Sequence, residues 1–318
     1  MNNRLISLDY AKLFFSIMIP LLHINFDSDI VVVDCLRQYV SRLGVPFFFS
    51  VSGLFLYKSV LKRGSLSAWL CFVRRIGVLL LFWLLIYSPL LVNNYSIPEI
   101  IFRTPAYLWY LTALLWVSIP FCFIKNRFVL YIMSVILYCV GTYFNGSYYW
   151  ISLGWKFYTD MFGTTRNGLL FPLCLMCAGE VAFRLYRIKK KMALFILFIS
   201  TILLIVEITY TFQFHVKGMD NSLYFGIPIF TLSLVYILIN YCNFHIKEND
   251  SFFNLNSKVS LLSSSIYFMQ YGVISVFLFL LKNVNPFIIY SFIIIIPIFY
   301  ILLFGNNYYF KIINNKFF

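Results

Sequence analysis

The feature that most constrains this chain is a succession of about ten apolar segments, each close to the length that an α-helix needs to cross a bilayer. A helix satisfies its own backbone hydrogen bonds in lipid, so the pattern predicts an all-α, polytopic transmembrane helical bundle. We expect one membrane-embedded domain over residues 1–318, ending in a short polar tail from Asn306 to Phe318. The expected segments lie at about residues 5–25, 39–60, 69–92, 105–123, 128–145, 168–186, 192–212, 224–243, 259–281 and 284–304.

Composition leaves no room for a sizeable soluble domain. Hydrophobic residues make up 62% of the chain and charged residues 11%, whereas about a quarter of the residues in an average globular protein are charged. The net charge of +14 is carried mainly by short connections between apolar segments. We therefore interpret the charge as a signal of membrane topology, and expect contacts with membrane lipids and no nucleic-acid partner.

The basic residues are divided unequally between alternate connections. Of the 25 Lys and Arg residues, 18 fall in one set of connections and seven in the other. By the positive-inside rule, this asymmetry predicts that both termini are cytoplasmic, which agrees with an even number of spans. The sequence thus predicts a multi-pass protein of the cell inner membrane.

The first apolar segment carries three ionisable residues, Asp9, Lys12 and His23. Lys12 and His23 are eleven residues apart, about three helical turns, so they are expected on nearly the same face and roughly 16 Å apart along the axis. Ionisable groups within a bilayer usually face a protein interior and serve a function. A histidine could take a proton from a hydroxyl group. It could equally be inert at the interface, and Asp9 and Lys12 could form an i,i+3 pair.

Two other patterns carry weaker signals. Cys174 and Cys177 have a C-x-x-C spacing, but no second cysteine pair or nearby histidine accompanies them, and we interpret them as buried apolar residues rather than metal ligands. We predict no metal site. Ser52 and Gly53 follow Pro46 in the second segment, where a proline and small residues could bend the helix and admit either a neighbouring helix or an elongated ligand.

Five motifs occur in a fixed order between residue 4 and about residue 275. They are Ser7–Lys12 followed by His23, Val45–Leu56, Tyr107–Leu115, Thr165–Gly168 with Pro172 and Gly179, and Ser264–Gln270. Together these motifs resemble the signatures of acyltransferase family 3, the membrane O-acyltransferases of bacterial surface glycans. That resemblance also agrees with the expected ten helices.

The resemblance implies transfer of an acyl group, usually acetyl, from cytoplasmic acyl-CoA to a sugar hydroxyl. The acceptor would be a lipid-linked or surface polysaccharide such as O-antigen or capsule. Acetyl-CoA would be a donor substrate, with no permanently bound cofactor. In this reading His23 matches the essential histidine, Lys12 matches its basic partner, and Asp9 lies one turn before Lys12.

The remaining predicted site residues follow from the same motifs. Those assigned to acyl-CoA binding are Arg74, Arg75, Ser52 and Gly53. Those assigned to the acceptor substrate are Trp109, Tyr110, Arg166, Asn167, Tyr267 and Gln270. The expected external connection 145–165 adds Tyr148, Tyr149, Trp150 and Trp155, whose rings suit sugars but also suit membrane anchoring.

The chain departs from the family pattern at two positions. The family has an arginine pair spaced R-x-x-R, but Phe72 takes the first position here, which makes Arg74 a candidate substitute beside Arg75. Gln270 stands where many relatives have histidine, and an amide hydrogen-bonds but cannot titrate. His23 is then the membrane-embedded candidate base, because the other two histidines, His215 and His245, are expected in loops.

Two other classes of protein remain alternatives. A polysaccharide flippase or other transporter has many spans and buried ions, but internal repeats or paired broken helices are expected there and none is evident. An O-antigen polymerase commonly has a large external loop, whereas the longest one expected here is about 23 residues. The sequence indicates neither the acceptor sugar nor the oligomeric state.

Overall fold

The computed structural model describes residues 5–24, 26, 31–91, 95–102, 104, 107–144, 158, 162, 164–185, 188–213, 223–242, 251–280 and 284–304. Within these ranges every regular element is a helix, which confirms the predicted all-α class. Some expectations fall outside them: the polar tail, the aromatic residues Tyr148, Tyr149, Trp150 and Trp155, and the histidines His215 and His245.

Each of the ten predicted segments contains a helix, and five helices in the described ranges are long and apolar enough to cross a membrane. Three further apolar helices are shorter, at Trp109–Phe123, Arg127–Tyr143 and Ile227–Asn240. Large apolar side chains such as Leu85, on one of the long helices, are exposed, as is typical of a surface that meets lipid. The chain is therefore a multi-pass membrane protein, while ten crossings and the orientation of the termini stay predictions.

The chain divides into two compact units, and each is described by itself. Unit 1 comprises Met1–Val45 and Leu238–Phe318, and unit 2 comprises Pro46–Ile237. The expectation that residues 1–318 form one domain stays a prediction.

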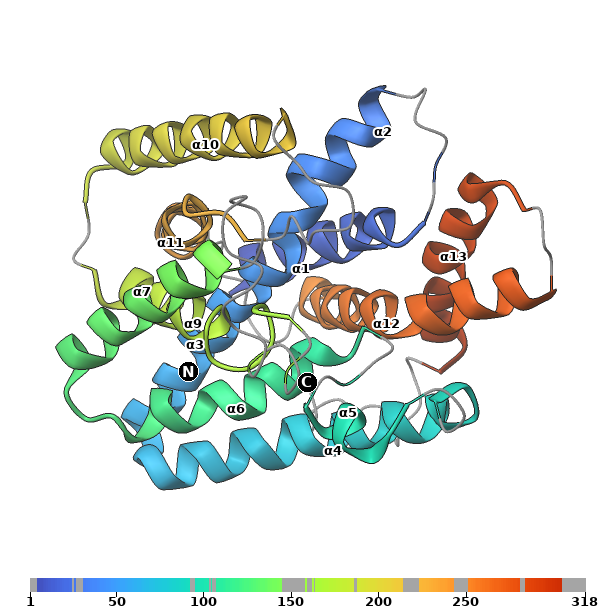
Figure 1. Ribbon diagram of the computed structural model, residues 1–318, viewed down its shortest axis with the longest axis horizontal. Helices are drawn as coiled ribbons and strands as arrows, with labels where there is room; N and C mark the ends of the chain where they lie inside the picture. The colour runs from blue at the N-terminus through green and yellow to red at the C-terminus, as the bar shows by residue number, and fades with distance from the viewer. Residues whose placement is uncertain are drawn as a thin grey trace. The chain divides into compact units, whose positions relative to one another are not determined.

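Unit 1 joins the two ends of the sequence. Its N-terminal part contains α1 (Ile6–Met18), η1 (Ile19–Leu22), α2 (Val31–Cys35), η2 (Leu36–Val40) and η3 (Ser41–Leu43). Its C-terminal part contains α12 (Ser251–Leu280) and α13 (Pro286–Phe304), and α12 packs against both α1 and α13 (Figure 1). The first helix of the chain therefore packs against a helix that begins about 250 positions later in the sequence.

Unit 2 is built around the short helix α9. Its elements are α3 (Gly44–Arg63, from Pro46 onward), α4 (Ser65–Leu91), α5 (Ile97–Phe102), α6 (Trp109–Phe123), α7 (Arg127–Phe144), α9 (Pro172–Arg184), α10 (Lys190–Gln213) and α11 (Ile227–Asn240, up to Ile237). α4 and α6 run alongside each other (Figure 1), and α9 packs against α6 and α7. Ten of the 13 residues of α9 are buried, so this helix forms the centre of the unit.

Local sequence explains where several helices begin and end. Gly64 has φ +80°, a left-handed conformation that glycine adopts without strain, and it separates α3 from α4. The side-chain oxygen of Asn126 accepts hydrogen bonds from the backbone N–H groups of Phe128 and Val129, which caps α7. Asn285 caps α13 in the same way, ahead of Pro286 at the first helical position.

Two glycines bring α3 and α9 into backbone contact. A Cβ atom at Gly53 would lie 2.1 Å from the carbonyl oxygen of Met176, and one at Gly179 would lie 1.7 Å from the carbonyl oxygen of Ser50. Both distances are far below van der Waals contact, so only glycine fits at either position. The small residues of the second apolar segment therefore admit a neighbouring helix, one of the two possibilities that the sequence left open.

Candidate active site

The first helical segment holds the three predicted catalytic residues. α1 carries Asp9 and Lys12, and η1 continues the segment so that His23 follows directly. Pro20 lies in the first turn of η1, where the helix tightens from α to 3₁₀ geometry. The backbone N–H of His23 donates to the carbonyl oxygen of Pro20 at 3.0 Å. His23 is thus held at the end of the segment, with its side chain half-buried.

The tighter turn of η1 changes the expected relation between Lys12 and His23. Residues in a 3₁₀-helix rise about 2.0 Å and rotate about 120° each, against about 1.5 Å and 100° in an α-helix. The axial separation therefore becomes about 18 Å, and His23 lies about a quarter of a turn away from the direction of Lys12. The expectation of nearly one face was wrong because the 3₁₀ turn at Pro20 separates the two residues.

Asp9 and Lys12 form the intrahelical pair that the sequence left open. The Lys12 ammonium nitrogen lies 3.4 Å from a carboxylate oxygen of Asp9. The Asp9 side chain is 8% exposed and that of Lys12 24%, so Asp9 is the deeper partner. A carboxylate at this distance offsets much of the positive charge of Lys12, which makes the pair close to neutral as a unit.

α12 lies beside α1 in a fixed register and runs in the same direction. The hydroxyl groups of Ser16 and Ser263 share a hydrogen bond of 2.8 Å. Phe26, just beyond His23, contacts the ring of Phe287 in the first turn of α13. Because α12 packs against α13 and a short connection joins them, the C-terminal end of α12 lies at the same end of unit 1 as His23.

This register brings Gln270 to the level of His23. His23 lies seven positions beyond Ser16, and Gln270 lies seven positions beyond Ser263, which is about two helical turns in each case. Gln270 is 0% exposed and Tyr267, one turn earlier, is 6% exposed. The α1–α12 pair therefore places the two predicted acceptor residues of the C-terminal segment near the level of His23, whereas Asp9 and Lys12 lie further along α1.

The second group of predicted residues lies in unit 2, where α3, α4 and α6 meet. The hydroxyl groups of Ser52 and Tyr110 share a hydrogen bond of 2.9 Å. Arg75 on α4 lies near Tyr110. Arg74 and Arg75 are both exposed. They point in directions about 100° apart, because they are neighbouring residues of one helix. The structure thus brings Arg75, Ser52 and Tyr110 together, while the substitution of Arg74 for the missing family arginine stays a prediction.

Trp109 links this cluster to Arg166. The Arg166 guanidinium lies over the indole ring, with its carbon atom 5.2 Å from the ring centroid, a cation–π arrangement. Phe49 contacts the rings of both Trp109 and Tyr110, at centroid distances of 6.2 and 4.6 Å. Cationic, aromatic and hydroxyl groups therefore form one continuous cluster along the first turn of α6.

Asn167 shapes the turn that presents Arg166. Its side-chain amide donates to the carbonyl oxygen of Phe162 at 2.6 Å, and its own carbonyl oxygen accepts from the hydroxyl of Tyr158. Gly168 follows with φ +74°, a conformation that other residues rarely adopt. The polar groups of Asn167 are thus committed to local structure, and its expected contact with the acceptor stays a prediction.

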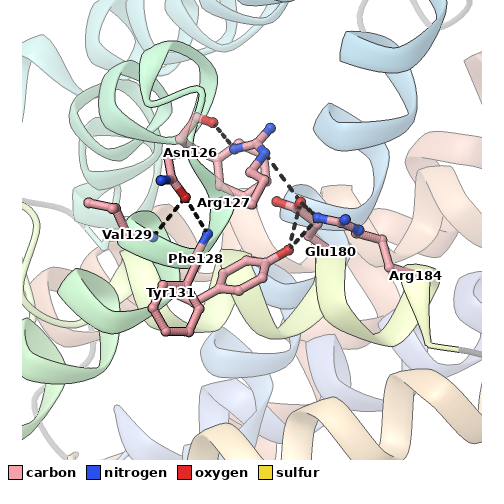
Figure 2. A network of polar contacts seen from close by, with 8 residues as sticks. Asn126, Arg127, Phe128, Val129, Tyr131, Glu180 and Arg184 are labelled. Carbon is pink, nitrogen blue, oxygen red and sulfur yellow. Dashed lines mark hydrogen bonds and ion pairs between the residues drawn. The ribbon is translucent and has the colours of Figure 1, made fainter.

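Sequence reasoning missed a network of charges around Glu180 in α9 (Figure 2). Glu180 is 0% exposed. One of its carboxylate oxygens, Oε1, lies 3.4 Å from Arg127 and 3.3 Å from Arg184, and accepts a hydrogen bond of 2.8 Å from the hydroxyl of Tyr131. The guanidinium carbons of Arg127 and Arg184 also lie 5.4 and 5.8 Å from the ring centroid of Tyr57.

The network connects three helices that lie far apart in the sequence. Arg127 begins α7, Arg184 ends α9, and Tyr57 lies in the C-terminal half of α3. The two arginines stand among the basic residues that predict topology, and a single acidic residue in an apolar segment was the signal that could have drawn attention to Glu180.

The two cysteines of the C-x-x-C motif lie buried within α9, as expected for apolar core residues. In the part of the chain that the structure describes, no group of three or more His, Cys, Asp or Glu side chains could hold a metal ion.

The predicted site residues therefore form two sets. Unit 1 contains the set Asp9, Lys12, His23, Tyr267 and Gln270. Unit 2 contains the set Ser52, Gly53, Arg74, Arg75, Trp109, Tyr110, Arg166 and Asn167.

Comparison with known proteins assigns the chain to a family. A family model described as an acyltransferase domain, that of acyltransferase family 3, matches residues 5–306, nearly the whole chain. No curated protein and no solved structure matches the chain. The matched region contains both sets of site residues, and its helices are those of a multi-pass membrane protein. This chain is accordingly a membrane acyltransferase and belongs to acyltransferase family 3.

Proposed function

We propose that the protein is an O-acetyltransferase of the cell inner membrane. It moves an acetyl group from acetyl-CoA to a sugar hydroxyl of a lipid-linked or surface polysaccharide, such as O-antigen or capsule. The observation that carries the proposal is His23, a half-buried histidine that ends the first helical segment of a chain in acyltransferase family 3.

His23 acts as the general base in this proposal. Its imidazole takes the proton of the sugar hydroxyl while the sugar oxygen attacks the thioester carbonyl carbon. The resulting tetrahedral intermediate collapses, the carbon–sulfur bond breaks, and the CoA thiolate receives the proton from His23. An alternative route has the imidazole carry the acetyl group briefly before the sugar accepts it. Both routes need His23 and give the same products.

The donor is proposed to enter from the cytoplasm. Arg75, with Arg74 beside it, is the candidate partner of the CoA phosphates, because guanidinium groups bind phosphate oxygens through paired hydrogen bonds. Arg75 is supported by its place near Tyr110, whose hydroxyl shares a hydrogen bond with that of Ser52. A polar surface of this kind suits the amide groups of the pantetheine arm.

The acceptor is proposed to bind at aromatic and polar side chains. Trp109 offers a flat ring that Arg166 already covers on one side, and stacking on aromatic rings is a common way to hold a sugar. In unit 1, Tyr267 is a separate candidate contact for the acceptor, one helical turn before the level of His23. The orientation of the chain predicted from its basic residues places His23 towards the outer face and Asp9 with Lys12 towards the cytoplasm.

Replacement of His23 tests the proposal. In a strain lacking the chromosomal copy, His23→Ala should lower O-acetylation of the surface polysaccharide by about 10³-fold, because general-base catalysis contributes about that much. NMR of the purified polysaccharide measures the ester, and immunoblotting measures protein abundance. His215→Ala and His245→Ala are matched controls, since they remove the other two histidines of the chain.

Three results would contradict the proposal. Normal acetylation by the His23→Ala protein would remove the catalytic role of His23. Loss of polymer export in the deletion strain, with the ester content unchanged, would indicate a transporter. Shortened glycan chains, with the ester content unchanged, would indicate a polymerase.

A further inference from the structure

Gln270 is a buried amide whose hydrogen-bonding groups are unused within the described structure. The side chain is 0% exposed, and neither its oxygen nor its nitrogen has a hydrogen-bond partner among the described residues. A buried primary amide offers two donors and an acceptor, and leaving them unpaired costs free energy. Such a group is best explained by a partner that binds there.

The register of α1 and α12 shows which part of the protein Gln270 serves. Ser263 faces α1, because its hydroxyl bonds that of Ser16. Gln270 lies two α-helical turns further along the same face of α12. His23 likewise lies seven residues beyond Ser16. The 3₁₀ geometry of η1 rotates His23 by only about a sixth of a turn away from the face of α1 that meets α12. Gln270 therefore lies on the α1 side of α12, at the level of His23.

The chemistry of the proposed reaction requires a hydrogen-bond donor at this level. When a sugar oxygen attacks a thioester, the carbonyl oxygen becomes an oxyanion, and asparagine or glutamine side chains can supply the N–H groups that stabilise it. His23 as general base cannot fill this role, because it receives the proton of the hydroxyl in the same step. Lys12 cannot fill it either, because it lies about 18 Å from His23 along the axis and its ammonium is paired with Asp9.

We infer that the side-chain amide of Gln270 donates a hydrogen bond to the carbonyl oxygen of the acyl donor and stabilises the tetrahedral oxyanion formed beside His23. This inference rests on the proposed function. It makes Gln270 a catalytic residue that acts without titrating. The amide holds the negative charge while the carbon–oxygen bond to the sugar forms, and releases the oxygen as a carbonyl when the carbon–sulfur bond breaks.

The test is steady-state kinetics of the full-length protein in lipid nanodiscs, with acetyl-CoA and the purified polysaccharide acceptor. Gln270→Leu keeps much of the side-chain volume and removes the donors, so kcat should fall about 10²-fold with both KM values within about threefold of wild type. Gln270→His retains a ring N–H that can donate and should keep kcat within about tenfold of wild type.

Ser264→Ala is the matched control. Ser264 is also on α12, and its hydroxyl donates to the carbonyl oxygen of Ser260 within the same helix. It should leave both kcat and KM unchanged. Thermal unfolding of each variant distinguishes loss of catalysis from loss of fold: for the inference to hold, Gln270→Leu must melt at or above the wild-type temperature, because it removes an unpaired buried amide.

Each remaining outcome would overturn the inference. Wild-type kcat in Gln270→Leu would show that the amide does not stabilise the transition state. A rise in the KM of either substrate with unchanged kcat would assign Gln270 to ground-state binding. A Gln270→Leu protein that unfolds at a lower temperature would assign it to the fold. Absence of acetyl transfer by the wild-type protein would reject the proposed function, and the inference with it.

Discussion

At the scale of single residues, Glu180 shows how much one buried charge can organise. Its carboxylate oxygen Oε1 serves Arg127, Arg184 and Tyr131 together (Figure 2). Two cations on one carboxylate are stable only while that carboxylate remains charged and in place. The side chain of Arg127 is 18% exposed and that of Arg184 is 45% exposed. Without the Glu180 carboxylate, water could therefore solvate the charge of Arg184 much better than that of Arg127.

Glu180→Gln should therefore destabilise unit 2 by about 3 kcal/mol, because it leaves a half-buried guanidinium without its counter-ion. Arg184→Gln should cost about 1 kcal/mol or less, because an exposed member of an ion pair contributes little. Thermal unfolding of the purified protein in detergent measures both changes. Equal effects of the two substitutions would show that Glu180 is not the centre of the network.

At the scale of helices, the contact between α3 and α9 depends on the absence of side-chain atoms. Gly53 and Gly179 approach the backbone of the partner helix so closely that a methyl group at either position would displace it. Cβ contacts of 2.1 and 1.7 Å to backbone oxygens cannot be relieved by rotating a side chain. α3 carries Ser52, so this contact also fixes the helix that bonds Tyr110.

Gly179→Ala should lower stability by about 3 kcal/mol, the cost of forcing extra atoms into a packed interior. Gly77→Ala is the matched control, because a Cβ at Gly77 on α4 would meet nothing within 4 Å. Alanine is the better helix former by about 1 kcal/mol, so this second change should stabilise the protein. Melting temperatures that move in opposite directions support the packing, whereas equal shifts would contradict it.

At the scale of the whole molecule, the distribution of basic residues predicts where the ends of the chain lie. A green fluorescent protein fused after Phe318 should fluoresce, because both termini are expected in the cytoplasm. Alkaline phosphatase fused after residue 150, within the connection expected outside, should be active. An inactive phosphatase there, with an active one after Phe318, would reverse the orientation. If alkaline phosphatase were active at both positions, or inactive at both, an odd number of spans between residue 150 and Phe318 would be contradicted.

The sequence alone was sufficient for the helical class and for the candidate histidine. Apolar segments of membrane length leave few structures open, because each must satisfy its own backbone hydrogen bonds. His23 stood out because an ionisable group in such a segment is costly. The pairing of Asp9 with Lys12 was also within reach, since residues three positions apart meet on any helix.

Helical periodicity was less reliable where the helix changed its form. The relation between Lys12 and His23 assumed a uniform α-helix, but the segment tightens into a 3₁₀ turn at Pro20. Proline was visible in the sequence, yet a proline can end a helix, kink it or start a new turn. Which of these occurs depends on what packs around it, and the sequence of one segment does not contain that information.

The pairing of distant segments was decided by tertiary structure. In the sequence, Ser16 is nearly 250 positions from Ser263, and His23 is as far from Gln270. Packing of α1 on α12 brings each pair to the same level. The same holds for Glu180 and Arg127, which belong to different apolar segments. Hydrophobicity and periodicity are local properties of a chain and determine which residues form helices. Contacts between helices depend on the shapes and charges of two surfaces at once, and only the folded protein brings those surfaces together.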